Sequence, residues 1–257
     1  MMDNVLLPLE LSDGFCLETV YYESGTLCIS TQAGCRMACP FCASGRVGLK
    51  RNLSSDELFT QVELHKGNDI KRVTLSGIGE PLDNFEVVKE FIKKSGYPVS
   101  VTTSVPDTEK LKELLKLSHN GVMLSFHAGF DETRKKLIPK ACQLDEIFHA
   151  VSEVWSEISV NKRKKVGFNY MLLDGINDSA EELDAFAGQV TNFKEVTVHL
   201  LVCNDVSGSS FKSPSVCVFT DAYELLRNNG LNVRRANNWR KSSNGGCGTL
   251  FLKTLQK

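Results

Sequence analysis

The sequence predicts an α/β fold in which a parallel sheet is rolled into a full or partial barrel. Two observations lead to this prediction. First, apolar strand-like segments alternate with amphipathic segments of helical periodicity, which is typical of parallel strands joined by helices. Second, the 257 residues suffice for one sizeable core, and the sequence shows no internal repeat and no interdomain linker.

The strands and helices can be assigned in chain order. The strand-like segments are TLCIST from Thr26, KRVTLSGIG from Lys71, PVSVTTS from Pro98, GVMLSFH from Gly121, KKVGFNYMLL from Lys164 and KEVTVHLLV from Lys194. The helical segments are SSDELFTQVELHK, NFEVVKEFIKK, DTEKLKELLKLS, a pair from Asp131 to about Ser156, DSAEELDAFAGQV and VFTDAYELLRNNG. Ser54 or Ser55 is expected to cap the first helix, and Gly230 to end the last. We expect residues 1–23 to form a strand hairpin and residues 24–257 the barrel domain, including a glycine-rich loop near the C-terminus.

Composition narrows the class of protein. The apolar fraction of 42% and the charged fraction of 24% are those of an ordinary globular chain, and the net charge of -1 argues against a general binder of polyanions. We identify no signal peptide, and no apolar run approaches the roughly 18 residues of a membrane span. We therefore expect a cytoplasmic protein without a membrane partner. Its nine cysteines then serve metals or chemistry rather than a disulfide framework.

The segment CRMACPFC places Cys35, Cys39 and Cys42 at C-x3-C-x2-C spacing directly after a predicted strand. In a parallel barrel such a loop lies at the mouth formed by the carboxyl ends of the strands. Three thiolates can hold three irons of a four-iron cubane and leave the fourth iron open to a substrate. The alternative is a structural zinc site with a distant fourth ligand such as Cys247. Spacing favours the iron–sulfur interpretation and leaves the zinc site open.

The cysteine loop and its surroundings resemble the RlmN/Cfr family of the radical S-adenosylmethionine (SAM) superfamily. An aromatic residue, Phe41, precedes the last cysteine, and the motifs occur in the order ETVY, GTLCISTQAGCRMACPFCASGRVGLKRNL, GIGEPLDN, LSFHA, LLDGIND and GGCG. The resemblance extends from Glu18 to Leu250. It implies a partial (β/α)6 barrel of the TIM type and an enzyme that methylates an adenine ring carbon of ribosomal or transfer RNA.

The resemblance also implies the cofactors and their ligands. Cys35, Cys39 and Cys42 would hold a [4Fe-4S] cluster that receives electrons from a flavodoxin or ferredoxin, and SAM would bind at the open iron. The SAM contacts carried over from the family are Gly79, Glu80, Thr102, Ser125, Phe126, His127 and Asn204. Glu80 would accept a hydrogen bond from the SAM ammonium, and His127 would line the site without an acid–base role. The alternatives are an ordinary strand-end turn at GIGEPL and a hydrogen-bonded core histidine.

Three further residues carry the methyl transfer that the resemblance implies. Cys247, among glycines that permit a positive φ, would receive a methyl group from one SAM, and the radical made from a second SAM would activate that methyl for attack on the adenine. Cys28 would then form a disulfide with Cys247 and free the product. Glu18 would act as the general base. Carbon 2 of adenine is electron-poor and resists simple methyl-cation transfer, which is why a radical is needed. We expect carbon 2 rather than carbon 8 as the target from the resemblance, and the sequence itself does not distinguish the two. The alternatives are a tight turn for the glycines around Cys247, a buried strand cysteine for Cys28 and a solvated edge residue for Glu18.

Substrate recognition is the part that the sequence leaves most open. Family members usually carry an additional N-terminal RNA-recognition domain, which we expect to be absent because Glu18 lies so near the start. A non-RNA small molecule or peptide substrate, or a non-catalytic iron–sulfur or zinc protein that binds RNA, therefore stay as alternatives. The segment from Arg234 to Lys241, which includes Trp239, is favoured for RNA contact. The charged runs KRKK and ETRKKLIPK are further candidates, with a solvated face as the alternative.

Overall fold

The structure, a computed structural model, describes residues 4–235, 246, 248–251 and 253–254. Its strands are β1 (Val5–Glu10), β2 (Phe15–Tyr22), β3 (Thr26–Ile29), β4 (Gln32–Ala33), β5 (Arg51–Asn52), β6 (Arg72–Leu75), β7 (Val99–Thr103), β8 (Gly121–Ser125), β9 (Val166–Leu172), β10 (Thr197–Val202), β11 (Asn232–Arg235) and β12 (Lys253–Thr254). Within the described residues the main sheet has ten strands in the order β1-β2-β3-β6-β7-β8-β9-β10-β11, with β12 beside β2. From β3 to β11 every neighbouring pair is parallel.

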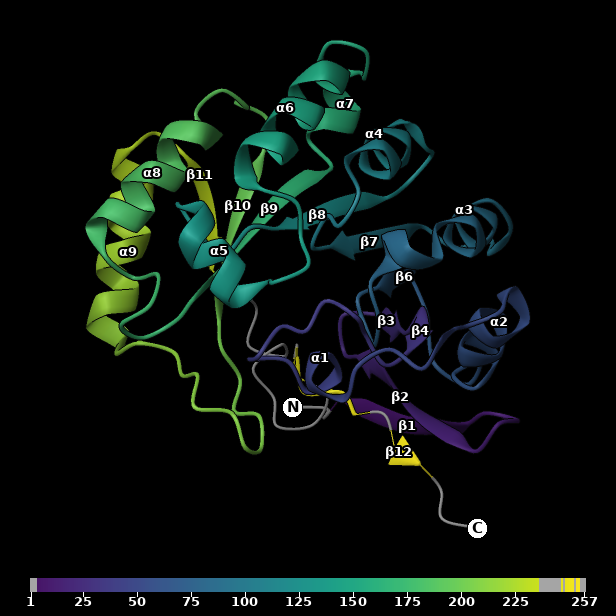
Figure 1. The fold of residues 1–257 in the computed structure, drawn as a ribbon. Helices are drawn as coiled ribbons and strands as arrows, with labels where there is room; N and C mark the ends of the chain where they lie inside the picture. The colour runs from purple at the N-terminus through teal and green to yellow at the C-terminus, as the bar shows by residue number, and fades with distance from the viewer. Residues whose placement is uncertain (1–3, 236–245, 247, 252, 255–257) are drawn as a thin grey trace.

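Helices cover the outer side of this curved sheet (Figure 1). They are α1 (Ala43–Val47), α2 (Ser55–Glu63), η1 (Pro81–Asn84), α3 (Phe85–Lys94), α4 (Thr108–Lys116), α5 (Asp131–Leu137), α6 (Leu144–Trp155), α7 (Val160–Arg163), α8 (Ala180–Val190) and α9 (Val216–Asn228). The predicted α/β fold with a parallel, partly closed barrel is thus confirmed. β11 adds a parallel strand that the sequence did not predict, because its exposed Arg234 and Arg235 resemble a basic loop more than a strand.

Local sequence explains where the helices begin and what they bury. Ser54, rather than Ser55, caps α2: its hydroxyl accepts a hydrogen bond from the Glu57 amide while the Glu57 carboxylate accepts one from the Ser54 amide. Behind the strands, apolar helix faces and alternate strand residues form one continuous core. Its centre is aromatic, with Phe126 stacked on Phe148 at 4.6 Å between ring centroids and tilted against Phe168 at 4.8 Å.

The two ends of the chain meet at one edge of the sheet. β1 and β2 form an antiparallel hairpin, and β2 continues the sheet by pairing with β3. β12 returns to pair with β2, opposite residues 15–16 (Figure 1). The hairpin is hydrogen-bonded into the barrel sheet, and the domain boundary at residue 23 stays a prediction. No helix in the described ranges is both long and apolar enough to cross a bilayer.

Candidate active site

A pocket opens at the carboxyl ends of the parallel strands, where active-site groups of such barrels gather. It brings together most of the residues predicted from the sequence. Those that line it are Cys35, Cys39, Cys42, Gly79, Glu80, Thr102, Ser125, His127 and Asn204. They come from separate segments between residues 35 and 204, so that only the folded barrel assembles them.

The three cysteines form one wall of this pocket. Cys35 and Cys39 are buried together with Met37, Leu137 and Ile138 in a small apolar cluster. Burial raises the pKa of the Cys35 thiol to about 12 and holds the pKa of Cys39 well above its ordinary value. The buried thiols of Cys35 and Cys39 are costly to ionise unless a cationic centre binds them, which fits an iron–sulfur cluster. In the described chain no three His, Cys, Asp or Glu side chains converge as a single metal ion requires.

The cysteine loop is fastened to distant parts of the chain. The amide of Ala43 donates to the Gly248 carbonyl at 2.9 Å, and the Ser44 hydroxyl donates to the Leu250 carbonyl at 2.9 Å. Arg46 donates to the Ser207 carbonyl at 2.6 Å. The wall that holds the thiols is therefore hydrogen-bonded to residues 248–250, directly after position 247.

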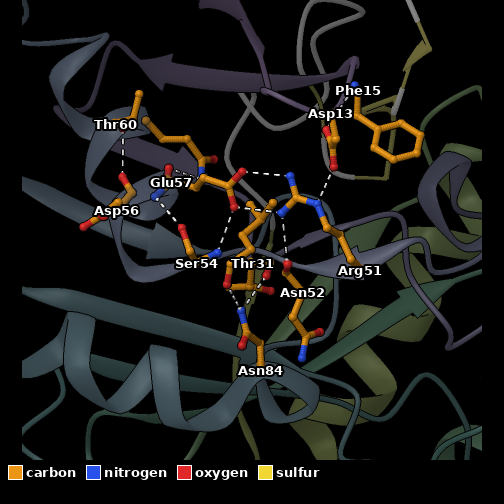
Figure 2. Close-up of polar contacts among 12 residues, drawn as sticks. Asp13, Phe15, Thr31, Arg51, Asn52, Ser54, Asp56, Glu57, Thr60 and Asn84 are labelled. Atoms are coloured by element: carbon orange, nitrogen blue, oxygen red, sulfur yellow. Dashed lines mark hydrogen bonds and ion pairs between the residues drawn. The ribbon is translucent and has the colours of Figure 1, made fainter.

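A polar network supports the chain where it enters and leaves this loop (Figure 2). Arg51, which follows the loop, donates hydrogen bonds to both carboxylate oxygens of Glu57 at 2.8 Å. It also forms an ion pair with Asp13 of the N-terminal hairpin. Below it, the Asn84 amide donates to the carbonyls of Thr31 and Leu53 at 2.8 Å each. These contacts join the hairpin, the loop and α2 into one support.

The opposite wall of the pocket is polar and centres on Glu80. One oxygen of its carboxylate accepts hydrogen bonds from the Thr103 hydroxyl at 2.5 Å and the Leu82 amide at 3.1 Å, and the other accepts one from the Ser104 amide at 2.8 Å. Burial nevertheless raises its pKa to about 7. Glu80 is thus a positioned carboxylate that a ligand ammonium would keep ionised. Its partner on β7 is Thr103, whereas the predicted contact Thr102 lines the pocket beside it.

His127 is fixed in one protonation state. The Met171 amide donates to its Nδ1 at 3.0 Å, which places the remaining ring proton on Nε2. Burial lowers its pKa to about 3, so the ring is neutral near pH 7. The ring of Phe41 meets it edge to face at 5.8 Å. His127 therefore lines the pocket as a neutral donor, as expected.

Phe126 is the predicted contact that does not reach the pocket. Its side chain is fully buried in the aromatic core behind the sheet. Successive residues of an extended strand point to opposite faces, so Ser125 and His127 face the pocket while the residue between them faces the helices. The Phe126 side chain therefore does not reach the pocket, and the predicted contact of this residue with the cofactor stays a prediction for its backbone.

Arg134 is a buried cation that the sequence did not single out as part of the site. Its guanidinium donates at 2.7–2.9 Å to the carbonyls of Ser104, Ser125, Phe126 and Cys142, and no carboxylate in the described chain forms an ion pair with it. The arginine thereby joins the ends of β7 and β8, where two pocket residues stand. Arg134 lies within the charged run ETRKKLIPK, which was a candidate for RNA contact or a solvated face. Because this arginine is buried, it neither contacts RNA nor belongs to a solvated face.

Asn169 on β9 is a second residue that the sequence analysis missed. It is buried, it lines the pocket, and its Oδ1 has no hydrogen-bond partner among the residues that the structure describes. A buried amide oxygen without a partner is costly unless a bound molecule supplies a donor. Only its place in the middle of a predicted strand was visible in the sequence.

The three residues predicted for methyl transfer lie near the rim or outside the described residues. Cys28 is buried on β3, with its Sγ 3.4 Å from the hydroxyl of Ser76, which itself lines the pocket. Glu18 on β2 accepts a hydrogen bond from the Phe251 amide at 2.9 Å. Cys247, like Trp239, lies outside the described residues.

Known proteins share this fold. A family model described as the radical SAM superfamily matches residues 29–187, more than half of the chain, so fold and site define a radical SAM enzyme. A radical SAM methyltransferase from Sphaerobacter thermophilus has a similar structure, with a TM-score of 0.78 and 25% identity over 97% of this chain and 82% of that one.

Relatives of known family narrow the assignment. The probable dual-specificity RNA methyltransferase RlmN of Carboxydothermus hydrogenoformans is 35% identical over 96% of this chain and 76% of its own length. Its counterpart in Finegoldia magna is 30% identical over 97% of this chain and 75% of its own length. The chain therefore belongs to the RlmN family of radical SAM methyltransferases.

Proposed function

We propose that this protein methylates an adenine ring carbon of ribosomal or transfer RNA, with carbon 2 preferred over carbon 8. The observation that carries the proposal is the convergence of three thiols, two of them buried, and a hydrogen-bonded carboxylate in one pocket at the barrel mouth. The relatives named as RNA methyltransferases support RNA as the substrate.

Each wall of the pocket has a distinct task in this proposal. Cys35, Cys39 and Cys42 would hold a [4Fe-4S] cluster, which when bound supplies the electron that splits SAM into methionine and a 5'-deoxyadenosyl radical. Glu80 accepts hydrogen bonds from the SAM ammonium and sets the direction in which the methionine part lies. A flavodoxin or ferredoxin is the proposed reductant.

The remaining polar residues would hold the rest of SAM. Ser125, Thr102 and Asn204 line the same pocket as Glu80, and Gly79, with φ of 110°, lets the backbone approach the ligand closely. Neutral His127 closes one side against Phe41. The apolar cluster behind the thiols keeps water from a reactive intermediate.

Methyl transfer itself would use two cysteines and a carboxylate. Cys247 takes the methyl group, which is then joined to the adenine, and Cys28 resolves the adduct by forming a disulfide with Cys247. Glu18 removes the proton from the ring carbon. Two contacts support these roles: Cys28 lies against Ser76 at the pocket wall, and Glu18 binds the backbone four residues after Cys247.

Anaerobic reconstitution tests the cofactor assignment. Wild-type protein is expected to bind iron and sulfide, absorb visible light as a four-iron centre does, and cleave SAM to 5'-deoxyadenosine. Cys39→Ala is expected to lose all three properties, whereas Cys217→Ala, a change at an exposed cysteine of α9, keeps them. A colourless protein with tightly held zinc contradicts the proposal.

Trapping tests the substrate and the two-cysteine mechanism together. Cys28→Ala is expected to accumulate a covalent protein–RNA adduct, and mass spectrometry of its digest identifies the nucleotide and the modified carbon. A fully active Cys28→Ala protein without any adduct contradicts the role of Cys28. An adduct with a small molecule or peptide contradicts RNA as the substrate.

A further inference from the structure

A second cavity, of about 450 Å³, lies beside the active-site pocket. Cys203 and Asn204, at the end of β10, line both hollows. Its apolar lining comes from Pro214 and from Val216 and Phe219 in the first turns of α9. Nothing in the methyl-transfer mechanism uses this cavity.

The wall between the two hollows is firmly held. The Ser213 hydroxyl accepts a hydrogen bond from the Cys203 amide at 2.7 Å, which fastens the loop after β10 to the strand end. Phe211 in the same loop packs edge to face on Phe41 of the cysteine loop at 6.3 Å. A molecule lying across the barrel mouth would therefore meet both hollows at a fixed spacing.

Arg235 supplies the cavity with a flat cation. Its guanidinium lies 4.4 Å from the ring centroid of Tyr223 and 6.0 Å from that of Phe219. The Arg235 side chain is exposed, and no side-chain hydrogen bond or ion pair joins its guanidinium to another residue in the described ranges. Its N–H groups are therefore available to a ligand. Nucleobases stack on such planes in single-stranded RNA recognition.

Asp205 favours a base over a phosphate in this cavity. Its carboxylate lines the same cavity and repels a phosphate, but it accepts hydrogen bonds from the N–H groups of a base edge. Guanine offers two neighbouring donors to one carboxylate, whereas uracil offers a single donor between two carbonyls. The hydroxyls of Ser213 and Thr220 add further polar contacts.

We propose that this cavity is a subsite for a nucleotide that adjoins the methylated adenosine, with its base stacked on Arg235 and its donor edge facing Asp205. The proposal rests on the proposed RNA substrate and adds a preference for guanine over uracil. Cys203 and Asn204 line both the cavity and the active-site pocket, so the subsite adjoins the reacting centre.

Fluorescence anisotropy with short single-stranded RNAs tests the subsite. One RNA carries a single adenosine flanked by guanosines, and the other carries the same adenosine flanked by uridines. Arg235→Gln and Arg235→Lys are both expected to weaken binding of the guanosine RNA by about tenfold, the scale of one lost base stack. Asp205→Asn is expected to abolish the preference for guanosine over uridine.

Arg227→Gln is the matched control. Arg227 also lies on Tyr223, at 5.7 Å from its ring centroid, but it does not line the cavity. This variant is expected to bind both RNAs like wild type, and SAM affinity is expected to stay unchanged in all four variants because none alters a residue of the active-site pocket.

Four outcomes overturn the subsite. If the Arg235 variants bind like the Arg227 control, the cavity takes no nucleotide, while methylation by the wild type leaves the proposed function standing. If Arg235→Lys restores full affinity, the contact is to a phosphate and the base subsite is wrong. If wild-type protein binds both RNAs equally, the role of Asp205 is wrong. A wild-type protein that neither binds nor methylates RNA overturns the proposed function and the subsite with it.

Discussion

The two walls of the active-site pocket are held in different ways. The polar wall is held by its neighbours in the sheet: Glu80 is bound by the end of β7, and Arg134 joins β7 to β8. The cysteine wall is held by residues from far along the chain, through contacts of Ser44 with Leu250 and of Arg46 with Ser207. The polar wall is thus held by the barrel itself, whereas the cysteine wall depends also on residues 207 and 250, far along the chain.

The largest expected effect comes from removing the buried cation of the polar wall. Arg134→Met leaves four carbonyls without donors, so the free energy of unfolding is expected to fall by roughly 3 to 5 kcal/mol. Urea denaturation measures the loss. Lys135→Met, on the exposed side of the same helix, is expected to stay within about 0.5 kcal/mol of wild type. Equal stabilities of the two variants would show that the polar wall does not depend on Arg134.

The next effect concerns Glu80 and depends on pH. Because its pKa is about 7, protonation below that pH removes the charge that binds the SAM ammonium, so SAM affinity is expected to rise as pH rises through 7. Glu80→Gln is expected to bind SAM roughly 10- to 100-fold more weakly and without that pH dependence. Calorimetric titration about one pH unit on either side of the pKa measures both changes. Glu86→Gln, at an exposed carboxylate, is the control.

The same carboxylate makes a prediction about stability. Burial raises its folded pKa above the ordinary value of 4.5, so between 4.5 and about 7 the folded protein binds more protons than the unfolded chain. Its contribution to stability is therefore greatest at low pH and declines as pH rises through this window. Glu80→Gln is expected to remove the decline, and an unchanged pH profile of unfolding contradicts the assignment of the raised pKa.

A smaller effect is expected at Asn169. Its Oδ1 has no partner in the described part of the chain, so Asn169→Leu is expected to change the free energy of unfolding by less than about 1 kcal/mol. If bound SAM satisfies this atom, the variant loses about one hydrogen bond and binds SAM roughly five- to tenfold more weakly. Unchanged SAM affinity would remove Asn169 from the binding site.

The smallest effect is expected on the cysteine wall. Ser44→Ala removes the hydrogen bond to the Leu250 carbonyl, at a loss of about 1 kcal/mol in the free energy of unfolding. Ser152→Ala, at an exposed position on α6, is the neutral control. A chelator is expected to remove the cluster faster from Ser44→Ala than from the control. Equal release rates would show that the cysteine wall does not depend on its contact with the C-terminal segment.

The sequence predicts the parts of this site that motifs carry. Spacing and strand ends place Cys35, Glu80 and His127 at the barrel mouth, and the structure brings them into one pocket. The sequence could not predict the role of Arg134. The four carbonyls around its guanidinium come from separate segments, and backbone carbonyls leave no signal in the residue types. The Phe126 side chain misses the pocket for a simpler reason. Adjacent side chains of a strand point to opposite faces, so three adjacent motif residues cannot all face the pocket.

The pairing of β12 with β2 bears on how the cysteine wall is assembled. Residues 15–16 and 253–254 lie side by side, and Ser44 contacts Leu250, 206 residues further along the chain. The cysteine loop therefore has all its contacts only once this distant segment has docked against it. Loading of iron and sulfide is expected to follow that docking rather than to precede it.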